Sequence, residues 1–319
     1  MDMQTEQRVT WSLAVVAAFV GIYFIWGTTY LAIAVSIQTI PPFISGGARF
    51  LLASAAMYLW LRARGPRPFA GLDWRLAALC GVLLTGMGNG FVGWGQQEVP
   101  SGIAALIVTA VPVNVLVLDW IFFSKRVPTR QALMGTAIAL AGVVTIITHT
   151  HTLNGDAKPI YLLVVLVATL AWSFGTLLQK RVASADSIFS FTCVQMLGGG
   201  MFQVFMSVVT GEWHGFAPRS MSLNSVMAVL YLVVFGSIIA INCYLFLLTR
   251  VPAPKVTTYA LVNPVVALLL GALVLNEQLT GITLAAAVLV LIGVTLVLFQ
   301  GVRWRRAVQG MERVTEITK

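Results

Sequence analysis

Two ionisable side chains, Arg49 and Asp119, lie inside long apolar stretches of this chain. A charge is costly in such surroundings, so each is a candidate for chemistry. Arg49 could bind a carboxylate. Alternatively, it could extend to the membrane surface or pair with Glu98 or Glu277. Glu277 itself lies at the end of a stretch, where we expect it to support the adjoining loop.

Asp119 could carry a proton. It lies close to the end of its stretch, which favours an ion pair with Arg126 or Lys180 instead. His149 and His151 could suggest a metal site, but two loop histidines without a third ligand are a weak signal. We therefore expect no metal and no other cofactor.

Uncharged polar and aromatic side chains within the apolar stretches form a better candidate pocket. Its predicted members are Trp26, Tyr30, Asn89, Trp94, Asn114, Trp172, Asn242, Tyr259 and Asn263. A buried amide must find a partner, so each asparagine could instead bond a neighbouring helix. Aromatic side chains on membrane helices also serve as packing or as interface belts. Trp26 and Trp172 differ from the rest because they lie deep in their stretches and at matching positions of a repeat.

Composition indicates which elements must position these residues. Of the 319 residues, 58% are hydrophobic and 10% are charged, and the mean hydropathy is +0.89. Ordinary soluble domains carry about 25% charged residues. Continuous apolar runs of about 20 residues are typical of membrane-spanning helices, and they exclude the alternating pattern of a β-barrel. We predict an all-α membrane protein with ten spans, at approximately 11–33, 43–61, 76–96, 103–123, 131–149, 160–179, 187–209, 224–248, 255–275 and 282–300.

The net charge of +9 reflects topology rather than nucleic-acid binding. With the N-terminus placed in the cytoplasm, 17 of the 20 lysines and arginines fall on the inner face. Only Lys158 and Arg219 fall on the outer face, and Arg49 lies within a span. This asymmetry follows the positive-inside rule and favours both termini in the cytoplasm. We expect the lipid bilayer as a partner, and no nucleic acid.

An internal duplication divides the chain. Val99-Pro100 and Val251-Pro252 each open an apolar run, and Pro112 and Pro264 follow at the same offset of 152 residues. Proline suits a first helical turn, whereas inside a helix it frees a carbonyl and bends the axis. Pro112 and Pro264 are therefore the predicted hinges. We expect a first five-helix repeat at 1–150, a second at 151–300 and a basic cytoplasmic tail at 301–319.

Five helices are an odd number, so the second repeat must enter the membrane from the opposite side. Inverted repeats of this kind are the architecture of many secondary transporters, with the site between the halves.

The N-terminal head is a poor signal-peptide n-region, because Asp2 and Glu6 accompany a single Arg8. The three cysteines, an odd number within spans, indicate small buried residues rather than disulfides.

Specific motifs accompany this arrangement. They are Arg49-Phe50, a Trp-bearing first helix in each half, Asn263-Pro264, Glu277-Gln278-Leu279-Thr280 and Gly293-Val294. With them, nearly the whole chain resembles the EamA-type drug/metabolite transporter superfamily, and within it the YddG-type amino-acid exporters. The first repeat departs from the pattern, with Ser124-Lys125-Arg126 where the second has Asn276-Glu277-Gln278. The resemblance implies a bacterial inner-membrane exporter.

The side-chain inventory restricts the substrate and the coupling. A polyanion needs several cations, and only Arg49 is available within a span. Small neutral or zwitterionic metabolites, such as aromatic or other neutral amino acids, fit better. Proton antiport needs a titratable group near mid-membrane, and none is apparent. We therefore expect a monomeric facilitator working by alternating access, with a proton-coupled exporter as the alternative.

Two other classes of protein fit less well. A channel requires a continuous polar stripe or a ring of charges, whereas the amides here are scattered. A membrane enzyme requires a catalytic cluster such as His-Glu-x-x-His, which the chain lacks. We expect no enzymatic activity.

Overall fold

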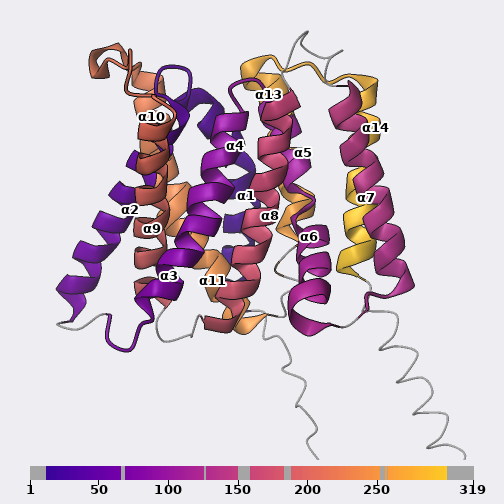
Figure 1. Ribbon diagram of the computed structural model, residues 1–319, viewed down its shortest axis with the longest axis horizontal. Helices are drawn as coiled ribbons and strands as arrows, with labels where there is room; N and C mark the ends of the chain where they lie inside the picture. The colour runs from indigo at the N-terminus through magenta and orange to yellow at the C-terminus, as the bar shows by residue number, and fades with distance from the viewer. Residues whose placement is uncertain are drawn as a thin grey trace, which may run out of the picture.

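The computed structural model describes residues 12–65, 69–125, 127–149, 159–182, 188–251, 256 and 258–299. These residues form a bundle of helices and contain no strand (Figure 1). Eight helical stretches are long and apolar enough to cross a bilayer, and Arg130–Ile146 and Tyr259–Leu275 are shorter apolar helices. The all-α expectation is confirmed, and each predicted span overlaps one of these stretches.

The first half of the chain contributes five helical stretches. They comprise α1 (Leu13–Ser36), α2 (Pro42–Arg64), α3 (Trp74–Gly81) with η1 (Val82–Asn89) and α4 (Gly90–Gly95), α5 (Ser101–Val108) with α6 (Val111–Leu118) and η2 (Asp119–Ser124), and α7 (Arg130–His149). The segments η1 and η2 are π-helical. Each continues the α-helix before it, so α3, η1 and α4 form one stretch.

The second half repeats this plan. It comprises α8 (Pro159–Val182), α9 (Ile188–Val209), the short η5 (Pro218–Ser220), α10 (Leu223–Tyr231) with η6 (Leu232–Ile239) and α11 (Ala240–Arg250), α13 (Tyr259–Leu275) and α14 (Gly281–Leu298). The segment η6 is π-helical, as η1 is. The third stretch of each half therefore carries a π-helical middle, which the sequence pattern did not predict. Such segments often occur at functional sites.

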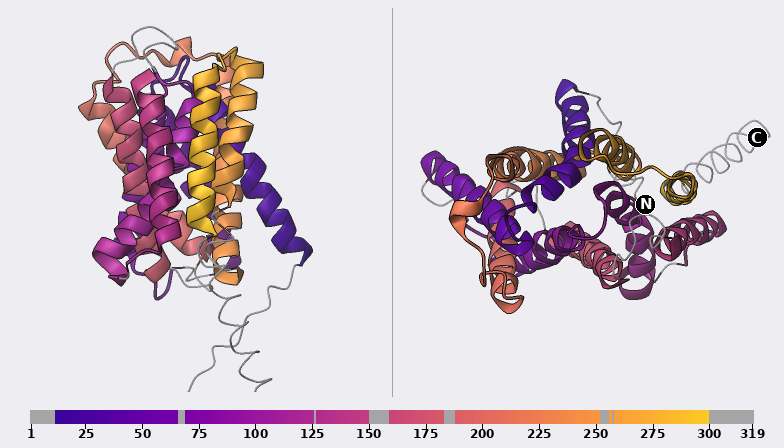
Figure 2. Two further views of the ribbon diagram at one scale, coloured as in Figure 1. Left: turned by 90° about the vertical axis from the view of Figure 1, so that its right-hand side faces the viewer. Right: turned by 90° about the horizontal axis from the view of Figure 1, so that it is seen from above.

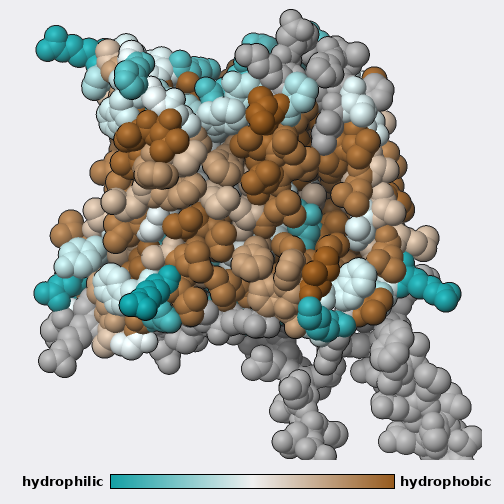
Figure 3. Space-filling view, in the orientation of Figure 1, coloured by the Kyte–Doolittle hydropathy of each residue, from teal (hydrophilic) through white to brown (hydrophobic). Residues whose placement is uncertain are grey.

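The two halves interlock instead of forming separate lobes. Helix α2 packs along α9, α7 along α14, and α1 along α11 and α13. Figure 2 shows from above that early and late helices lie next to one another. Glycines permit the closest of these approaches: a Cβ on Gly293 would lie 2.4 Å from the backbone nitrogen of Ala139. Figure 3 shows on one face of the molecule a broad hydrophobic band between more polar ends, as a bilayer requires.

The predicted bend at Pro112 takes the form of an interruption of the α-helix at Thr109 and Ala110, whose backbones keep right-handed helical angles. Helix α5 ends at Val108, and Pro112 lies in the first turn of α6. Proline has no N–H for the carbonyl of Val108, so the α-helical ladder stops there. The Thr109 N–H instead reaches the carbonyls of Ala105 and Leu106 at 3.1 and 3.2 Å, and Ala110 N–H reaches Ile107 at 3.0 Å. The halves differ here, because Pro264 remains inside α13.

Two helix starts are capped by glutamates from the other half of the chain. Helices α2 and α5 both begin after a proline and have no side-chain cap of their own. Glu212 accepts hydrogen bonds from the backbone N–H groups of Phe43 and Ile44 at 3.0 and 2.9 Å. A carboxylate at a helix N-terminus satisfies first-turn donors and complements the helix dipole.

Glu277 does the same for α5. It accepts from Ser101 N–H at 2.7 Å and from Gly102 N–H at 3.1 Å. Glu277 was expected to support the adjoining loop, and in the structure it caps the N-terminus of α5. Both caps lie at the upper end of the bundle in Figure 1, where α2 and α5 begin.

Glu212 generates a pH prediction. Partial burial raises its pKa above the ordinary glutamate value, against the opposing effect of the hydrogen bonds from Phe43 and Ile44. The folded protein therefore binds this proton more tightly than the unfolded chain. The stability contributed by Glu212 falls as pH rises from the ordinary pKa through the raised one. We expect thermal melting in detergent between about pH 4 and pH 8 to show wild type losing stability relative to Glu212→Gln as pH rises. A gain relative to Glu212→Gln over that window would show that the N–H bonds dominate and depress the pKa.

Candidate functional site

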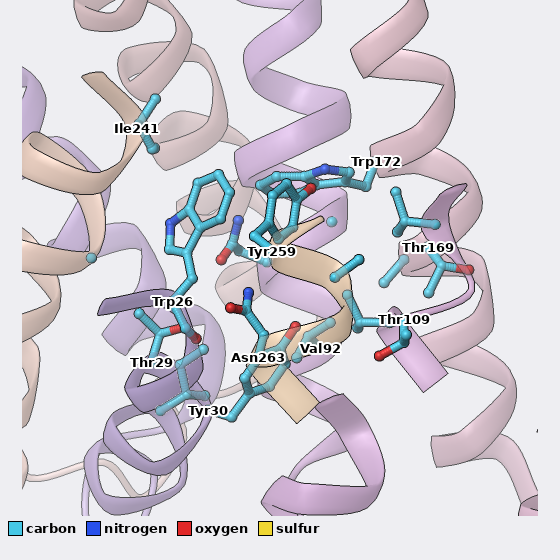
Figure 4. Close-up of a pocket in the computed structure, with 18 of the residues that line it drawn as sticks. Trp26, Thr29, Tyr30, Val92, Thr109, Thr169, Trp172, Ile241, Tyr259 and Asn263 are labelled. Carbon is cyan, nitrogen blue, oxygen red and sulfur yellow. The ribbon is translucent and has the colours of Figure 1, made fainter. Parts of the chain in front are cut away.

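A cavity lies between the two halves of the bundle, about midway along its helices. Its volume is about 70 Å³ for the centres of water-sized molecules, enough for several waters. The lining comes from α1, α2, η1, α4, α5, α6, α8, η6, α11 and α13, so both halves build it. Figure 4 shows the rings of Trp26, Trp172 and Tyr259 close together, with Thr109 and Thr169 to one side of them and with Asn263 and Tyr30 below.

The aromatic side is a cluster of rings from four helices. Trp26 meets Trp172 edge to face at a centroid distance of 6.1 Å, and meets Tyr259 at 4.8 Å. Tyr244 packs behind them, 5.2 Å from Trp26 and 5.9 Å from Tyr259. Edge-to-face contacts fix ring orientation, so this side presents a rigid apolar surface to the cavity.

The polar side consists of hydroxyls and amides. Thr109 Oγ1 donates to the carbonyl of Ala105 at 2.8 Å and Thr169 Oγ1 to that of Leu166 at 2.7 Å. Asn89 Nδ2 donates to the carbonyl of Leu84 at 3.3 Å, across the π-helical turn of η1. Each of these side chains is held by its own helix, Thr169 also accepts from Asn114 Nδ2 at 2.8 Å, and the oxygens keep acceptor capacity for a ligand.

Asn263 ties the site together. In the amide orientation that satisfies both groups, its Nδ2 donates to the carbonyls of Tyr23 and Tyr259 at 3.1 Å each. The first bond joins α13 to α1, and the second lies within α13, one residue before Pro264. Asn263 therefore stabilises the proline-containing turn and positions α13 against α1.

Arg49 lies at one edge of the cavity and is only 3% exposed. Its Nε donates to Ser237 Oγ at 2.8 Å, and its guanidinium lies 4.5 Å from the ring centroid of Phe50. The two readings that placed Arg49 at the surface or paired it with Glu98 or Glu277 are wrong. The side chain is buried, Glu98 is exposed, and Glu277 caps α5.

Gly236 makes room for this arginine. A Cβ at Gly236 would lie 3.0 Å from Arg49 Nη2 and 3.0 Å from a methyl group of Thr29. Both distances are tighter than ordinary contact, so a side chain here would displace the guanidinium. The glycine lies in η6, directly before Ser237, the hydrogen-bond partner of Arg49.

Six of the nine residues predicted for the pocket line this cavity, namely Trp26, Tyr30, Asn89, Trp172, Tyr259 and Asn263. Their role in binding stays a prediction. Sequence reasoning missed Thr29, Thr109, Thr169 and the two glycines, Gly88 and Gly236, in the π-helical segments. For Thr109 a signal existed, because it lies three residues before Pro112.

The other three predicted residues lie elsewhere. Trp94 stacks on Tyr161 with ring centroids 4.6 Å apart. Asn114 donates to Thr169 Oγ1 at 2.8 Å, so it supports the lining from behind. Asn242 donates to the carbonyl of Ile238 at 2.6 Å, within its own helix. Pro112 and Pro264 do not line the cavity, although their neighbours Val111 and Asn263 do.

The remaining candidates lie away from the cavity. Asp119 is half-buried at the start of η2, and Lys180 is exposed near the end of α8, without an ion pair between them in the described structure. Arg126 and His151 lie outside the described residues. Among the residues that the structure describes, no group of three or more His, Cys, Asp or Glu side chains could hold a metal ion.

Comparison with known proteins agrees with this architecture. The model of the EamA-like transporter family matches the chain twice, at residues 12–148 and 159–299. The chain belongs to the EamA-like transporter family. The double match corresponds to the two halves of the bundle, and the family makes the chain a multi-pass membrane transporter, as expected from the resemblance.

Individual EamA-type relatives cover most of the chain. It is 36% identical over 286 residues to the "Uncharacterized inner membrane transporter YedA" of Escherichia coli, covering 89% of this chain and 90% of that protein. It is 26% identical over 305 residues to the "Probable amino-acid metabolite efflux pump" of E. coli, covering 89% and 94%. A solved crystal structure with 17% identity superposes with a TM-score of 0.62, covering 91% and 98% of the two chains, and supports the fold alone.

The position of Asn263 generates a test of the site's construction. Asn263→Asp removes the amide donors and turns a carboxyl toward two carbonyl oxygens, whereas Asn263→Ala only deletes the bonds. We expect Asn263→Asp to destabilise the protein by about 1–3 kcal/mol more than Asn263→Ala, because buried carbonyls then face an unpaired acceptor. Thermal melting in detergent measures the difference. Equal stability of the two variants would show that the amide does not donate to Tyr23 and Tyr259.

Proposed function

We propose that this protein exports small neutral or zwitterionic metabolites, in particular aromatic or other neutral amino acids, by alternating access around the central cavity. The observation that carries the proposal is the character of the cavity lining. Rigid aromatic rings face hydroxyls and amides, between two halves that share one plan. Secondary transporters place their sites between such halves.

The proposed topology has ten spans, with both termini in the cytoplasm. The described basic residues at helix ends on the lower side of Figure 1 are Arg62, Arg64, Arg75, Lys125, Arg130, Lys180 and Arg250. Arg219 lies on the opposite side, with the carboxylates of Glu98, Glu212 and Glu277. By the positive-inside rule this distribution supports a cytoplasmic location for the lower side. Repeats at 1–150 and 151–300 are inverted relative to each other, and 301–319 form a cytoplasmic tail.

The lining favours the proposed substrates. Trp26, Trp172 and Tyr259 suit an apolar or aromatic side chain, and the threonine and asparagine side chains suit its polar end. A polyanion would require several cations, and Arg49 is the single basic residue in the lining as described. The E. coli protein that is 26% identical to this chain is named a probable amino-acid metabolite efflux pump, which supports the same substrate class. The protein is proposed to act as a monomer, without a cofactor or enzymatic activity. Its proposed location is the inner membrane, since its 36% identical relative is named an inner membrane transporter.

Facilitated transport is favoured over proton antiport. No carboxylate or imidazole lies among the described residues that line the cavity. Asp119 is the group that a proton-coupled exporter would use, because it is half-buried within a membrane stretch. The proposed movement is rocking of the two halves, with hinges at Pro112, where the helix is broken, and at Pro264.

Uptake of labelled amino acids into liposomes tests this function, with and without an imposed proton gradient. We expect saturable uptake that needs no gradient. Trp172→Ala should reduce it about tenfold or more, because the variant removes one wall of the aromatic side. Trp94→Ala is the matched control, since Trp94 stacks on Tyr161 outside the cavity and its loss should leave uptake near wild type.

Each alternative has its own outcome. Uptake that requires the gradient would favour the proton-coupled exporter. Equal losses in Trp172→Ala and Trp94→Ala would contradict the assignment of the cavity as the substrate site. Currents through single open pores would identify a channel instead.

A further inference from the structure

Arg49 is a buried positive charge that no described acidic residue neutralises. Its side chain is 3% exposed and lies within the membrane-spanning stretch Pro42–Arg64. Arginine stays protonated in proteins, so the charge cannot be lost as that of a lysine can. An uncompensated charge in such a place is costly, and it is retained where it has a task.

The carboxylates in the described part of the chain are engaged or distant. Glu212 and Glu277 cap α2 and α5 at the upper end of the bundle. Glu98 is exposed, and Asp73 accepts backbone N–H bonds at the start of α3. Asp119 lies near the opposite end, in η2. The guanidinium therefore has hydroxyl and aromatic neighbours, Ser237 and Phe50, instead of a counter-ion.

These neighbours orient the guanidinium toward open space. Ser237 accepts the Nε–H at 2.8 Å, which leaves the Nη groups as the free end of the fork. Gly236 makes space for Nη2. Arg49 lines the main cavity and also a smaller one of about 20 Å³, toward the upper end, with Ile33 and Asn89 shared by both. The guanidinium thus lies at the boundary of two adjoining spaces.

The smaller cavity has a mixed lining, in which one buried polar atom lacks a hydrogen-bond partner. Gln203 is 1% exposed and donates from Nε2 to the carbonyl of Thr85 at 2.7 Å. Its Oε1 has no hydrogen-bond partner in the described structure. A buried unpaired acceptor is costly, and it requires a donor. The ammonium group of a zwitterion could supply that donor, whereas its carboxylate could not. Ser36 and Ser45, hydrogen-bonded to each other at 3.0 Å, complete this polar wall.

We propose that the Arg49 guanidinium binds the carboxylate of the transported substrate, with the remainder of the molecule directed toward Trp26 and Trp172. This inference rests on the proposed function and specifies its substrate class. A carboxylate matches the guanidinium fork in two hydrogen bonds and supplies the missing counter-charge only while the substrate is bound. One arginine suits one carboxylate, so the site selects monocarboxylates over amides of the same shape.

The test compares L-leucine with L-leucinamide, which has an amide where leucine has the carboxylate. Binding to the purified full chain is followed by the fluorescence of its tryptophans, in chloride buffer. We expect wild type to bind leucine about 10- to 100-fold more tightly than the amide, as for hydrogen bonds to a charged group. Arg49→Lys should weaken leucine binding yet keep the preference, and Arg49→Gln should abolish it. The matched control, Arg75→Gln, changes an exposed arginine at the start of α3 and should retain the wild-type ratio.

Several results would overturn the inference. Equal affinity of wild type for leucine and leucinamide would assign the guanidinium to a resident inorganic anion such as chloride. A preference that persists in Arg49→Gln would place carboxylate recognition elsewhere. If Arg49→Gln does not fold, the wild-type ratio and Arg49→Lys still decide. Equal liposome uptake of acid and amide defeats only this inference, whereas failure of amino acids both to bind and to enter liposomes defeats the proposed function with it.

Discussion

The interior of a bilayer offers no water to backbone N–H and C=O groups, and this constraint acts on each irregular point within a span. An unbroken helix satisfies its own backbone, but a break must be satisfied by the protein. Before Pro112, the N–H groups of Thr109 and Ala110 bond carbonyls three residues back, those of Leu106 and Ile107. The Thr109 hydroxyl donates to the carbonyl of Ala105. At the starts of α2 and α5, Glu212 and Glu277 accept the first-turn N–H groups. The second half of the chain therefore completes helices of the first.

The cavity lies where the irregular points within the spans meet. The break between α5 and α6, the π-helical segments η1 and η6, and the proline turn of α13 all contribute to its lining. Irregular backbone is tolerated within a membrane protein where it lines such a space. Glycines in the π-helical segments let large side chains approach, as at Gly88, where a Cβ would lie 2.9 Å from the Trp172 ring. The same features that make the helices imperfect thus create room for Arg49 and the aromatic rings.

Much of this fold could be predicted from the sequence, because apolar runs, basic loop residues and recurring prolines are local patterns. Trp26 and Trp172 could be predicted for the pocket because the repeat pairs them and both lie deep in their spans. Trp94 is the same residue type but faces Tyr161, and only packing decides which face of a helix meets the cavity. The hydrogen-bond partner of Arg49 could not be predicted, because Ser237 lies 188 residues away in the sequence and is not charged. The π-helical segments and the capping of α2 by Glu212 likewise arise from contacts between distant segments.

Accessibility of the cavity to substrate tests the central claim most directly. Val108 lines the cavity and is half-buried, so Val108→Cys, in a chain with its three native cysteines replaced, places one thiol there. Ser220→Cys, at an exposed position near the upper end, is the control. The account predicts that a transported amino acid slows labelling of Val108→Cys by a small water-soluble thiol reagent and leaves labelling of Ser220→Cys unchanged. Labelling of Val108→Cys at the same rate with and without that amino acid would contradict the account.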